Sequence, residues 1–311
     1  MVTMCDLAAR LPLLIGKLLD REELLGRGRF REETMTDLFA GSLAAFAGPE
    51  FVIEYPIEVQ TGGDVDLRFW HAASDLEIAL RLQAKRLSPR RVAKKSVAAN
   101  RRSYHELLHM PKKQGTYQFR TLAATAAPVL PLYMFYNHQS FVDDPTITGT
   151  LPEVRGINLA FASDIAAELE AKVFAAATLP RQVLHHKRAV RLQPHFFTLE
   201  TILCPASVSR PLEGGGVPSP TSVSDALIAR WNELPQLAVI GEDGNKDGVL
   251  RRLYQPPSIR PSARTHSRLA DGPPVRIDKS LTRPRLTFIS GRTDDSRTPR
   301  IDPNVARDRL T

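Results

Sequence analysis

Cysteine is scarce in this sequence: Cys5 and Cys204 are the two in 311 residues. They lie far apart, and neither belongs to a C-x-x-C pair or to a Cys/His spacing of the kind that binds structural zinc. The scarcity argues against a disulfide scaffold and against a structural zinc site. Long apolar runs are also missing, because no stretch approaches the ~18–20 uninterrupted apolar residues that a membrane-spanning helix needs.

The N-terminus has little of what a secretory signal requires. Its apolar patch at 11–15 contains Pro12, and charged residues follow from Lys17 with no small-residue cleavage site before them. We therefore expect a cytoplasmic protein that does not enter a membrane.

The composition indicates a folded protein with a basic balance. Hydrophobic residues make up 42% of the chain, which is enough to build a packed core. Lys and Arg number 42 against 34 Asp and Glu, for a formal net charge of +8. Such an excess favours a polyanionic partner, because Lys and Arg displace counterions from a phosphate backbone. Solubility accounts for the excess equally well, so charge alone does not select nucleic acid.

Hydrophobic periodicity predicts two N-terminal helices followed by strands. The helices cover 3–20 and 31–46, and the apolar residues of the second form a narrow stripe at 3.6-residue spacing. Strands are predicted at 51–59, 65–70 and 78–87 from their β-branched, aromatic or alternating character. The last two strands are joined by a polar stretch that suits a hairpin connection.

The following segment is predicted to return to helix and then to a buried strand. Helices are expected at 91–109 and 117–127, and the almost wholly apolar stretch 129–136 suits a central or parallel strand. The order α-β-β-β-α-β describes an α/β core with a mixed central β-sheet flanked by helices. Predicted C-terminal additions are strands at 157–162 and 195–204 and helices at 164–177 and 224–234.

Composition divides the chain into three predicted parts. Residues 1–205 form the α/β domain, with its core at 28–140, and 206–254 form a helical extension. From about residue 255 the apolar periodicity disappears, so 255–311 is predicted to be a disordered tail. The tail holds eleven Arg and one Lys against six Asp, a formal charge of +6. It suits either an electrostatic arm for nucleic acid or a solvated tail without a fixed role.

The residues best suited to chemistry lie on the predicted hairpin. If the hairpin closes near residue 73 or 74, opposed positions sum to about 147, so Asp64 faces Gln83 and Asp66 faces Arg81. Side chains two positions apart share a face of a strand, which gathers Asp64 and Asp66 beside Gln83 and Lys85. A cluster of oxygen donors with one ammonium suits phosphodiester hydrolysis with Mg²⁺ or Mn²⁺.

Lys85 has a predicted role that follows from its neighbours. It is placed to orient the attacking water or to stabilise the charge that develops on the phosphate. A lysine beside two carboxylates keeps its proton, so an electrostatic role is favoured over that of a base.

An Asp followed by Gln-x-Lys, on a hairpin behind a Glu-bearing helix, resembles the PD-(D/E)xK, or restriction-endonuclease-like, nuclease superfamily. The Gln form resembles its Mrr-like branch. The resemblance covers residues 1 to about 140, or to 205 at its widest, and implies a metal-dependent endodeoxyribonuclease that acts in a restriction or phage-defence setting. The implied catalytic residues are Asp64, Gln83, Lys85, Glu32 and Asp66, of which all but the lysine would bind the metal.

The glutamate on the helix is predicted from a further pattern of the superfamily, in which a Glu is followed by apolar residues three, six and seven positions later. Glu32 fits this pattern through Met35, Leu38 and Phe39, and Glu33 is the alternative. The segments 32–37, 62–64, 83–87 and 133–137 are also similar to an uncharacterised bacterial family with this core.

Two positions depart from the superfamily motif. Gly63 stands where a proline is usual, and Gln83 replaces the second carboxylate. Because a neutral amide binds a metal more weakly than a carboxylate, the alternative is a module of the same fold that binds nucleic acid without cutting it.

A basic run follows the hairpin and is a candidate nucleic-acid interface. The segment 81–113 holds eleven Lys and Arg against the single acid Glu106. This density suits a surface that follows a phosphate backbone, although a solvated helix face has the same composition. DNA is the favoured partner, and a homodimer is compatible with duplex cutting. The predicted nucleic-acid-binding residues are Arg86, Arg90, Arg91, Lys94, Lys95, Arg101 and Arg102.

Overall fold

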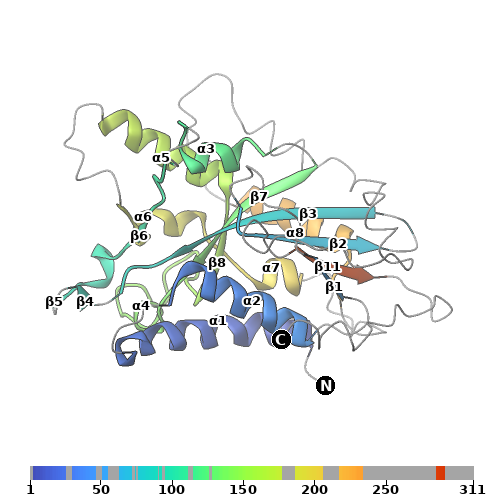
Figure 1. Cartoon of the computed structure of the whole chain (residues 1–311), viewed down its shortest axis with the longest axis horizontal. Coiled ribbons are helices and arrows are strands. Elements are labelled where there is room, and N and C mark those ends of the chain that lie inside the picture. The colour runs from blue at the N-terminus through green and yellow to red at the C-terminus, as the bar shows by residue number, and fades with distance from the viewer. Residues whose placement is uncertain are drawn as a thin grey trace, which may run out of the picture.

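A mixed β-sheet forms the centre of the fold, and helices cover both of its faces (Figure 1). The strand order is β1-β11-β2-β3-β7-β8-β10. The predicted α/β class with a mixed, helix-flanked sheet is thereby confirmed. The computed structural model describes residues 3–25, 30–46, 51–54, 63–71, 74, 76–89, 91–92, 95–110, 115–125, 128–176, 186–205, 217–233 and 285–290.

The predicted hairpin is present in the predicted register. β2 (Val65–His71) pairs antiparallel with β3 (Leu76–Arg86), and Asp66 faces Arg81 across the pair. β7 (Val129–Tyr136) runs parallel to β3 on its other side. The register is well determined because one slip would move the buried leucines of β2 and β3 to the opposite face.

The sheet extends beyond this centre on both sides. β8 (Ile157–Phe161) pairs antiparallel with β7, and β10 (Phe197–Thr198) pairs antiparallel with β8. At the other edge, β1 (Phe51–Glu54) pairs antiparallel with β11 (Arg285–Ser290).

Four helices share one apolar core with one face of the sheet. The two N-terminal helices, α1 (Met4–Arg21) and α2 (Glu32–Phe46), lie below the sheet in Figure 1 and confirm the first two predicted helices. Thr3 is the N-cap of α1 and forms a capping box. Its hydroxyl accepts a hydrogen bond from the Asp6 backbone N–H, and the Asp6 carboxylate accepts one from the Thr3 backbone N–H. The other two are α7 (Glu200–Leu203) and α8 (Pro220–Glu233).

Helix α8 packs with the hairpin rather than apart from it. Val223 and Leu227 of α8 are fully buried in the same core as Leu67 of β2 and Leu82 of β3. The helix predicted at 224–234 is therefore present, and this part of the predicted 206–254 extension belongs to the body that carries the hairpin.

A second core lies on the opposite face of the sheet. It contains Tyr133 and Phe135 of β7 together with side chains of α3 (Gln118–Ala123), α5 (Ala162–Ala176) and α6 (Ala189–Leu192). The short helix α4 (Gln139–Val142) follows β7 directly and packs near α1. The two cores place the sheet between helix layers, as Figure 1 shows.

The predicted helix at 91–109 is wrong. The described residues there form β4 (Arg91–Val92), β5 (Lys95–Ser96), the 3-10 helix η2 (Ala99–Arg101) and β6 (Ser103–His105). β6 pairs with β9 (His186–Arg188), more than eighty residues further along the chain. Pairing with a distant strand has overridden the local helical tendency of a Lys-, Arg- and Ala-rich stretch.

The strand predicted at 195–204 is correct only for β10. The 3-10 helix η4 (Gln193–His195) precedes it, and α7 follows it within two residues. A short apolar run does not by itself distinguish a strand from a buried helix.

The predicted disordered tail is wrong for Arg285–Ser290, which form β11 between β1 and β2, parallel to β2. Leu286 and Phe288 are fully buried, and the Phe288 ring stacks on that of Phe69 with 4.8 Å between centroids. Six residues within a Pro- and Arg-rich stretch are too few to produce a periodic signal. The rest of 255–311 lies outside the described residues.

Cys5 of α1 and Cys204, which follows α7, form a disulfide with 4.9 Å between their Cα atoms. The two lie 199 residues apart, so no local spacing predicts the pair. The expectation of no disulfide framework therefore fails for this one bond, which ties α1 to α7. None of the helices in the described ranges has the length and apolar character of a membrane span.

Candidate active site

The end of β3 meets the N-terminal end of α2, and here predicted site residues converge. Glu32 Oε2 accepts a hydrogen bond from Lys85 Nζ at 3.2 Å, and Glu32 Oε1 accepts one from the Arg86 backbone N–H at 3.2 Å. Lys85 is buried, whereas Glu33 is exposed. Of the two candidate helix glutamates, the structure thus brings Glu32 to the lysine.

Asp64 lies immediately before β2 and reaches across to β3. Its backbone N–H donates to Leu82 O at 2.7 Å, and its Oδ2 accepts from the Ala84 backbone N–H at 2.7 Å. The carboxylate is thereby fixed beside the Gln83–Lys85 segment. Gly63 permits this close approach, because a Cβ there would lie 2.5 Å from Arg81 Cγ. The crowding by Arg81 therefore explains why a glycine occupies the position at which the superfamily motif usually has a proline.

Gln83 lies on β3 opposite Tyr133 of β7 and is 1% exposed. Within the described part of the chain, neither its amide nitrogen nor its amide oxygen has a hydrogen-bond partner. An unsatisfied buried polar group costs about 1–3 kcal/mol, so such an amide is unusual in a folded protein. Its position next to Asp64 makes it a candidate ligand group.

Asp66 forms an ion pair with Arg81 across the hairpin. Its carboxylate is buried and accepts from Arg81 Nε at 3.1 Å and from Arg81 Nη2 at 3.3 Å. The two-point contact across the hairpin makes Asp66 an ion-pair partner that holds β2 against β3. The sequence carried a signal for this, because the predicted register already placed an arginine opposite Asp66.

The chemistry of the donors fits a hard divalent cation. Glu32, Asp64 and the Gln83 amide offer oxygen atoms, which Mg²⁺ and Mn²⁺ prefer. Over the described ranges, no group of three or more His, Cys, Asp or Glu side chains is arranged to hold a metal. A cation here would therefore need the Gln83 amide, main-chain carbonyls or water beside the two carboxylates.

Two of the predicted nucleic-acid-binding residues are instead committed to internal contacts, which corrects that prediction. Arg86 forms an ion pair with the buried Glu22. Arg102 is 1% exposed and donates from Nε and Nη2 to the Ser88 carbonyl, and burial lowers the pKa of its guanidinium to about 10. The Arg102 charge is enclosed by the fold and cannot follow a phosphate backbone, whereas the half-buried Arg86 is held by its ion pair with Glu22.

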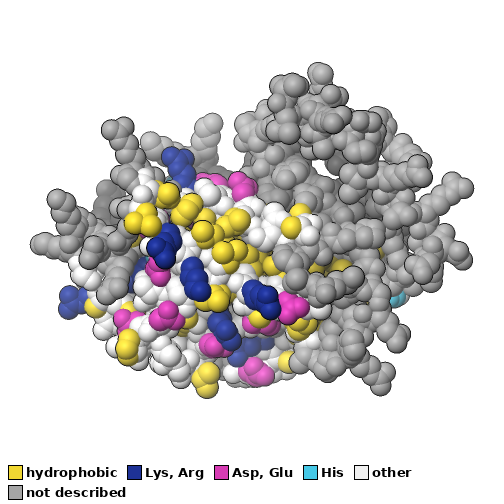
Figure 2. All heavy atoms as spheres, turned by 90° about the horizontal axis from the view of Figure 1, so that it is seen from below, with side chains coloured by type: hydrophobic (Ala, Val, Ile, Leu, Met, Phe, Trp, Pro, Cys, Tyr) yellow, Lys and Arg dark blue, Asp and Glu magenta, His cyan; other side chains and the backbone are white. Residues whose placement is uncertain are grey.

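The other predicted basic residues divide into exposed and undescribed ones. Arg101 is exposed at the end of η2. Arg90 and Lys94 lie outside the described residues, as do the side chains of Arg91 and Lys95. Figure 2 shows the molecule from the side on which α1 and α2 lie. Over the described part of this surface, basic side chains alternate with acidic and apolar ones and form no continuous basic patch.

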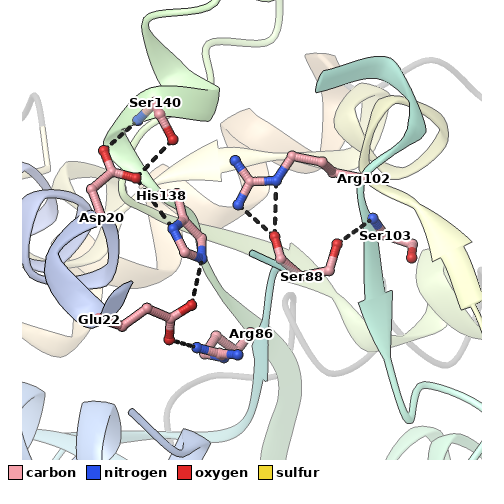
Figure 3. A network of polar contacts seen from close by, with 8 residues as sticks. All are labelled: Asp20, Glu22, Arg86, Ser88, Arg102, Ser103, His138 and Ser140. Carbon is pink, nitrogen blue, oxygen red and sulfur yellow. Dashed lines mark hydrogen bonds and ion pairs between the residues drawn. The ribbon is translucent and has the colours of Figure 1, made fainter. Parts of the chain in front are cut away.

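A buried polar network beside the candidate site was not predicted (Figure 3). Its centre is His138, 2% exposed, whose Nδ1 lies 3.2 Å from Asp20 Oδ1 and whose Nε2 lies 3.8 Å from Glu22 Oε1. Asp20 also accepts from the backbone N–H and the hydroxyl of Ser140, both at 2.7 Å. Glu22 continues the network to Arg86. Its members come from α1, η1 (Glu22–Leu24), β3, the turn after β7 and α4, so no sequence spacing reveals it.

His138 and Asp20, at the centre of this network, both stabilise the folded state at neutral pH relative to acidic pH. Burial is the largest influence on His138 and lowers its pKa. Burial alone would raise the pKa of Asp20, but hydrogen bonds from His138 and Ser140 outweigh it and lower that pKa. Each group binds its proton less readily in the folded state than in the unfolded state.

The free energy of unfolding is therefore expected to fall as the pH is lowered. The His138 contribution is present above its unfolded pKa, ~6.5, and is lost as the pH falls through the lower folded pKa. The Asp20 contribution is lost in the same way below ~3.9. The measurement is urea unfolding at a series of pH values. In His138→Gln, the free energy of unfolding should change less with pH than in wild type as the pH falls below ~6.5. The exposed His109→Gln is the matched control, and equal pH slopes for wild type and His138→Gln would contradict the assignment.

Comparisons with known proteins give one relationship. A search of curated proteins and a search of solved structures each found no match to the chain. The model of a family of unknown function, DUF6615, matches residues 4–306. The match spans the α2 glutamate, the hairpin and β11. The chain therefore belongs to the family of unknown function DUF6615.

Proposed function

We propose that this protein is a metal-dependent nuclease with a restriction-endonuclease-like core that hydrolyses phosphodiester bonds of DNA. The observation that carries the proposal is the convergence of Glu32, Asp64 and Lys85 at one end of the hairpin. Glu32 contacts Lys85 Nζ at 3.2 Å, and Asp64 contacts the Ala84 backbone N–H at 2.7 Å. A helix glutamate, a strand-start aspartate and a Gln-x-Lys strand are the parts that the superfamily motif combines.

The arrangement of elements is compatible with that core. A hairpin, β2 and β3, is preceded by a glutamate-bearing helix, and β7 joins β3 in parallel after the intervening α3. Parallel pairing requires a crossover connection, which the segment between β3 and β7 provides. The order of the main elements supports the restriction-endonuclease-like interpretation.

Each residue then has a chemical role. Glu32, Asp64 and the Gln83 amide would hold Mg²⁺ or Mn²⁺, which when bound would polarise the phosphate and lower the pKa of a water molecule. Lys85 donates to the phosphate oxygen on which negative charge develops, and its contact with Glu32 fixes the ammonium before substrate arrives. The Asp66–Arg81 pair keeps the strand register on which the Asp64 position depends.

A second candidate is a nucleic-acid-binding module of the same fold that does not cut. The observation that favours it is the amide at Gln83 in place of a carboxylate, which weakens a metal site. Binding of DNA or RNA that weakens with salt, without metal-dependent cutting, would select this candidate.

Purified protein is expected to nick and linearise supercoiled DNA in Mg²⁺ or Mn²⁺ and to leave it intact in EDTA. Asp64→Asn, purified in parallel, should lose this activity because a neutral amide replaces a metal-binding carboxylate. Its fold should survive, since the amide oxygen can still accept from the Ala84 N–H. The measurement is a time course on agarose gels, with thermal unfolding as the check on folding. Equal cutting by both proteins would refute the proposed site.

A further inference from the structure

Two neighbouring residues on the sheet carry buried polar atoms without partners. Gln83 of β3 and Tyr133 of β7 are paired in register on adjacent parallel strands, so their side chains share a face of the sheet. Tyr133 is fully buried and Gln83 nearly so. Across the described residues, Gln83 Nε2, Gln83 Oε1 and Tyr133 Oη make no hydrogen bond.

Among the tyrosines that the structure describes, the other two that are fully buried have hydrogen-bond partners. The Tyr104 hydroxyl donates to Asn137 Oδ1 at 2.5 Å, and the Tyr136 hydroxyl donates to Thr36 Oγ1 at 3.4 Å. Each unsatisfied buried polar atom costs about 1–3 kcal/mol, and native folds keep few of them. Three such atoms on two adjacent residues indicate a place where the fold leaves polar groups for a ligand.

The surroundings of Tyr133 identify the kind of ligand. A tyrosine hydroxyl can donate a hydrogen bond, and the negative charge of Asp64 acts on that of Tyr133. The ring is held by stacking on Phe135, with 5.6 Å between centroids. A fixed donor and a buried amide beside a carboxylate suit water molecules around a cation better than an apolar group.

We propose that Tyr133 is a positioning residue for Gln83, and that its hydroxyl and the Gln83 amide are satisfied together by a hydrated divalent cation bound at Asp64. This inference rests on the proposed metal-dependent function and adds to it a residue from outside the hairpin. Tyr133 acts through Gln83 and the hydration water, not by direct contact with the phosphate.

The test compares Tyr133→Phe with Tyr104→Phe, the same substitution at a tyrosine whose hydroxyl is paired. Without metal, Tyr133→Phe should unfold at the wild-type temperature or above it, because the change removes an unpaired hydroxyl. Tyr104→Phe should unfold at a lower temperature, because Asn137 Oδ1 loses its donor. In calorimetric titration with Mn²⁺, Tyr133→Phe should bind roughly 10–100-fold more weakly than wild type, the usual effect of losing a group that orients a ligand. Tyr104→Phe should bind like wild type.

The outcomes separate this inference from the proposed function. Equal Mn²⁺ affinity of wild type and Tyr133→Phe would overturn the role of Tyr133 and leave the nuclease proposal standing. A loss of metal-free stability in Tyr133→Phe as large as that in Tyr104→Phe would also overturn it, since the hydroxyl would then have a partner in the fold. Absence of Mn²⁺ binding by the wild type would overturn both.

Discussion

Lys85→Ala is expected to slow DNA cleavage by about 10²–10³-fold, the usual cost of removing one group that stabilises charge in the transition state. The ammonium is buried at the end of β3 and is fixed 3.2 Å from Glu32 Oε2. DNA binding measured in EDTA should change little, because the interaction develops mainly as the phosphate gains charge. Initial cleavage rates and fluorescence anisotropy with labelled duplex measure the two effects separately.

Two further variants make this result specific. Lys17→Ala removes an exposed lysine from α1 and should cut at the wild-type rate. Lys85→Arg keeps the charge but replaces a compact ammonium by a planar fork, and should recover activity only in part. A Lys85→Ala protein that cuts within about threefold of wild type would place the chemistry elsewhere.

Phe288→Ala should lower the free energy of unfolding by about 3–5 kcal/mol, as is typical when a buried aromatic ring is truncated. The ring is fully buried in the core below the sheet and stacks on Phe69 of β2. The large effect is expected even though the residue lies in a stretch whose composition predicts disorder. Urea unfolding followed by circular dichroism measures it.

Ser290→Ala is the matched control at the end of the same strand. Its hydroxyl is only partly buried and donates to Trp70 O at 3.3 Å, so the change should cost no more than about 1 kcal/mol. If residues 285–290 were disordered, Phe288→Ala would have no more effect than this control. That result would remove β11 from the sheet and leave β2 as an edge strand.

The parts of the fold that could be predicted have local causes. The α2 stripe repeats every 3.6 residues, and β2 and β3 are joined by a short connection, so helix and register follow from nearby residues. The same local geometry brought Asp64 to β3, whereas Glu32 is predicted from the helix pattern of the superfamily. Asp66, which the motif predicts as a metal ligand, forms an ion pair with the arginine that the register places opposite it.

The parts that could not be predicted depend on residues far apart in the chain. β6 pairs with β9, β11 inserts beside β2, and Cys5 bonds to Cys204, and none of these contacts leaves a periodic or motif signal. The ion pair of Arg86 and the burial of Arg102 likewise depend on where η1 and the segment before β6 pack. A basic residue in a sequence has a charge, but only its neighbours in space decide whether that charge faces solvent.

The sequence by itself determined the α/β class and the hairpin register, which places Asp64 beside Gln83 and Lys85, because periodicities of 2 and 3.6 and a short connection act over few residues. Glu32 is predicted only through the resemblance to the nuclease superfamily. Only the tertiary structure decided that part of the C-terminal tail is an interior strand between β1 and β2, that Arg102 is buried, and that Tyr133 lies beside Gln83. Those outcomes depend on burial and pairing between distant segments, which local propensity does not encode.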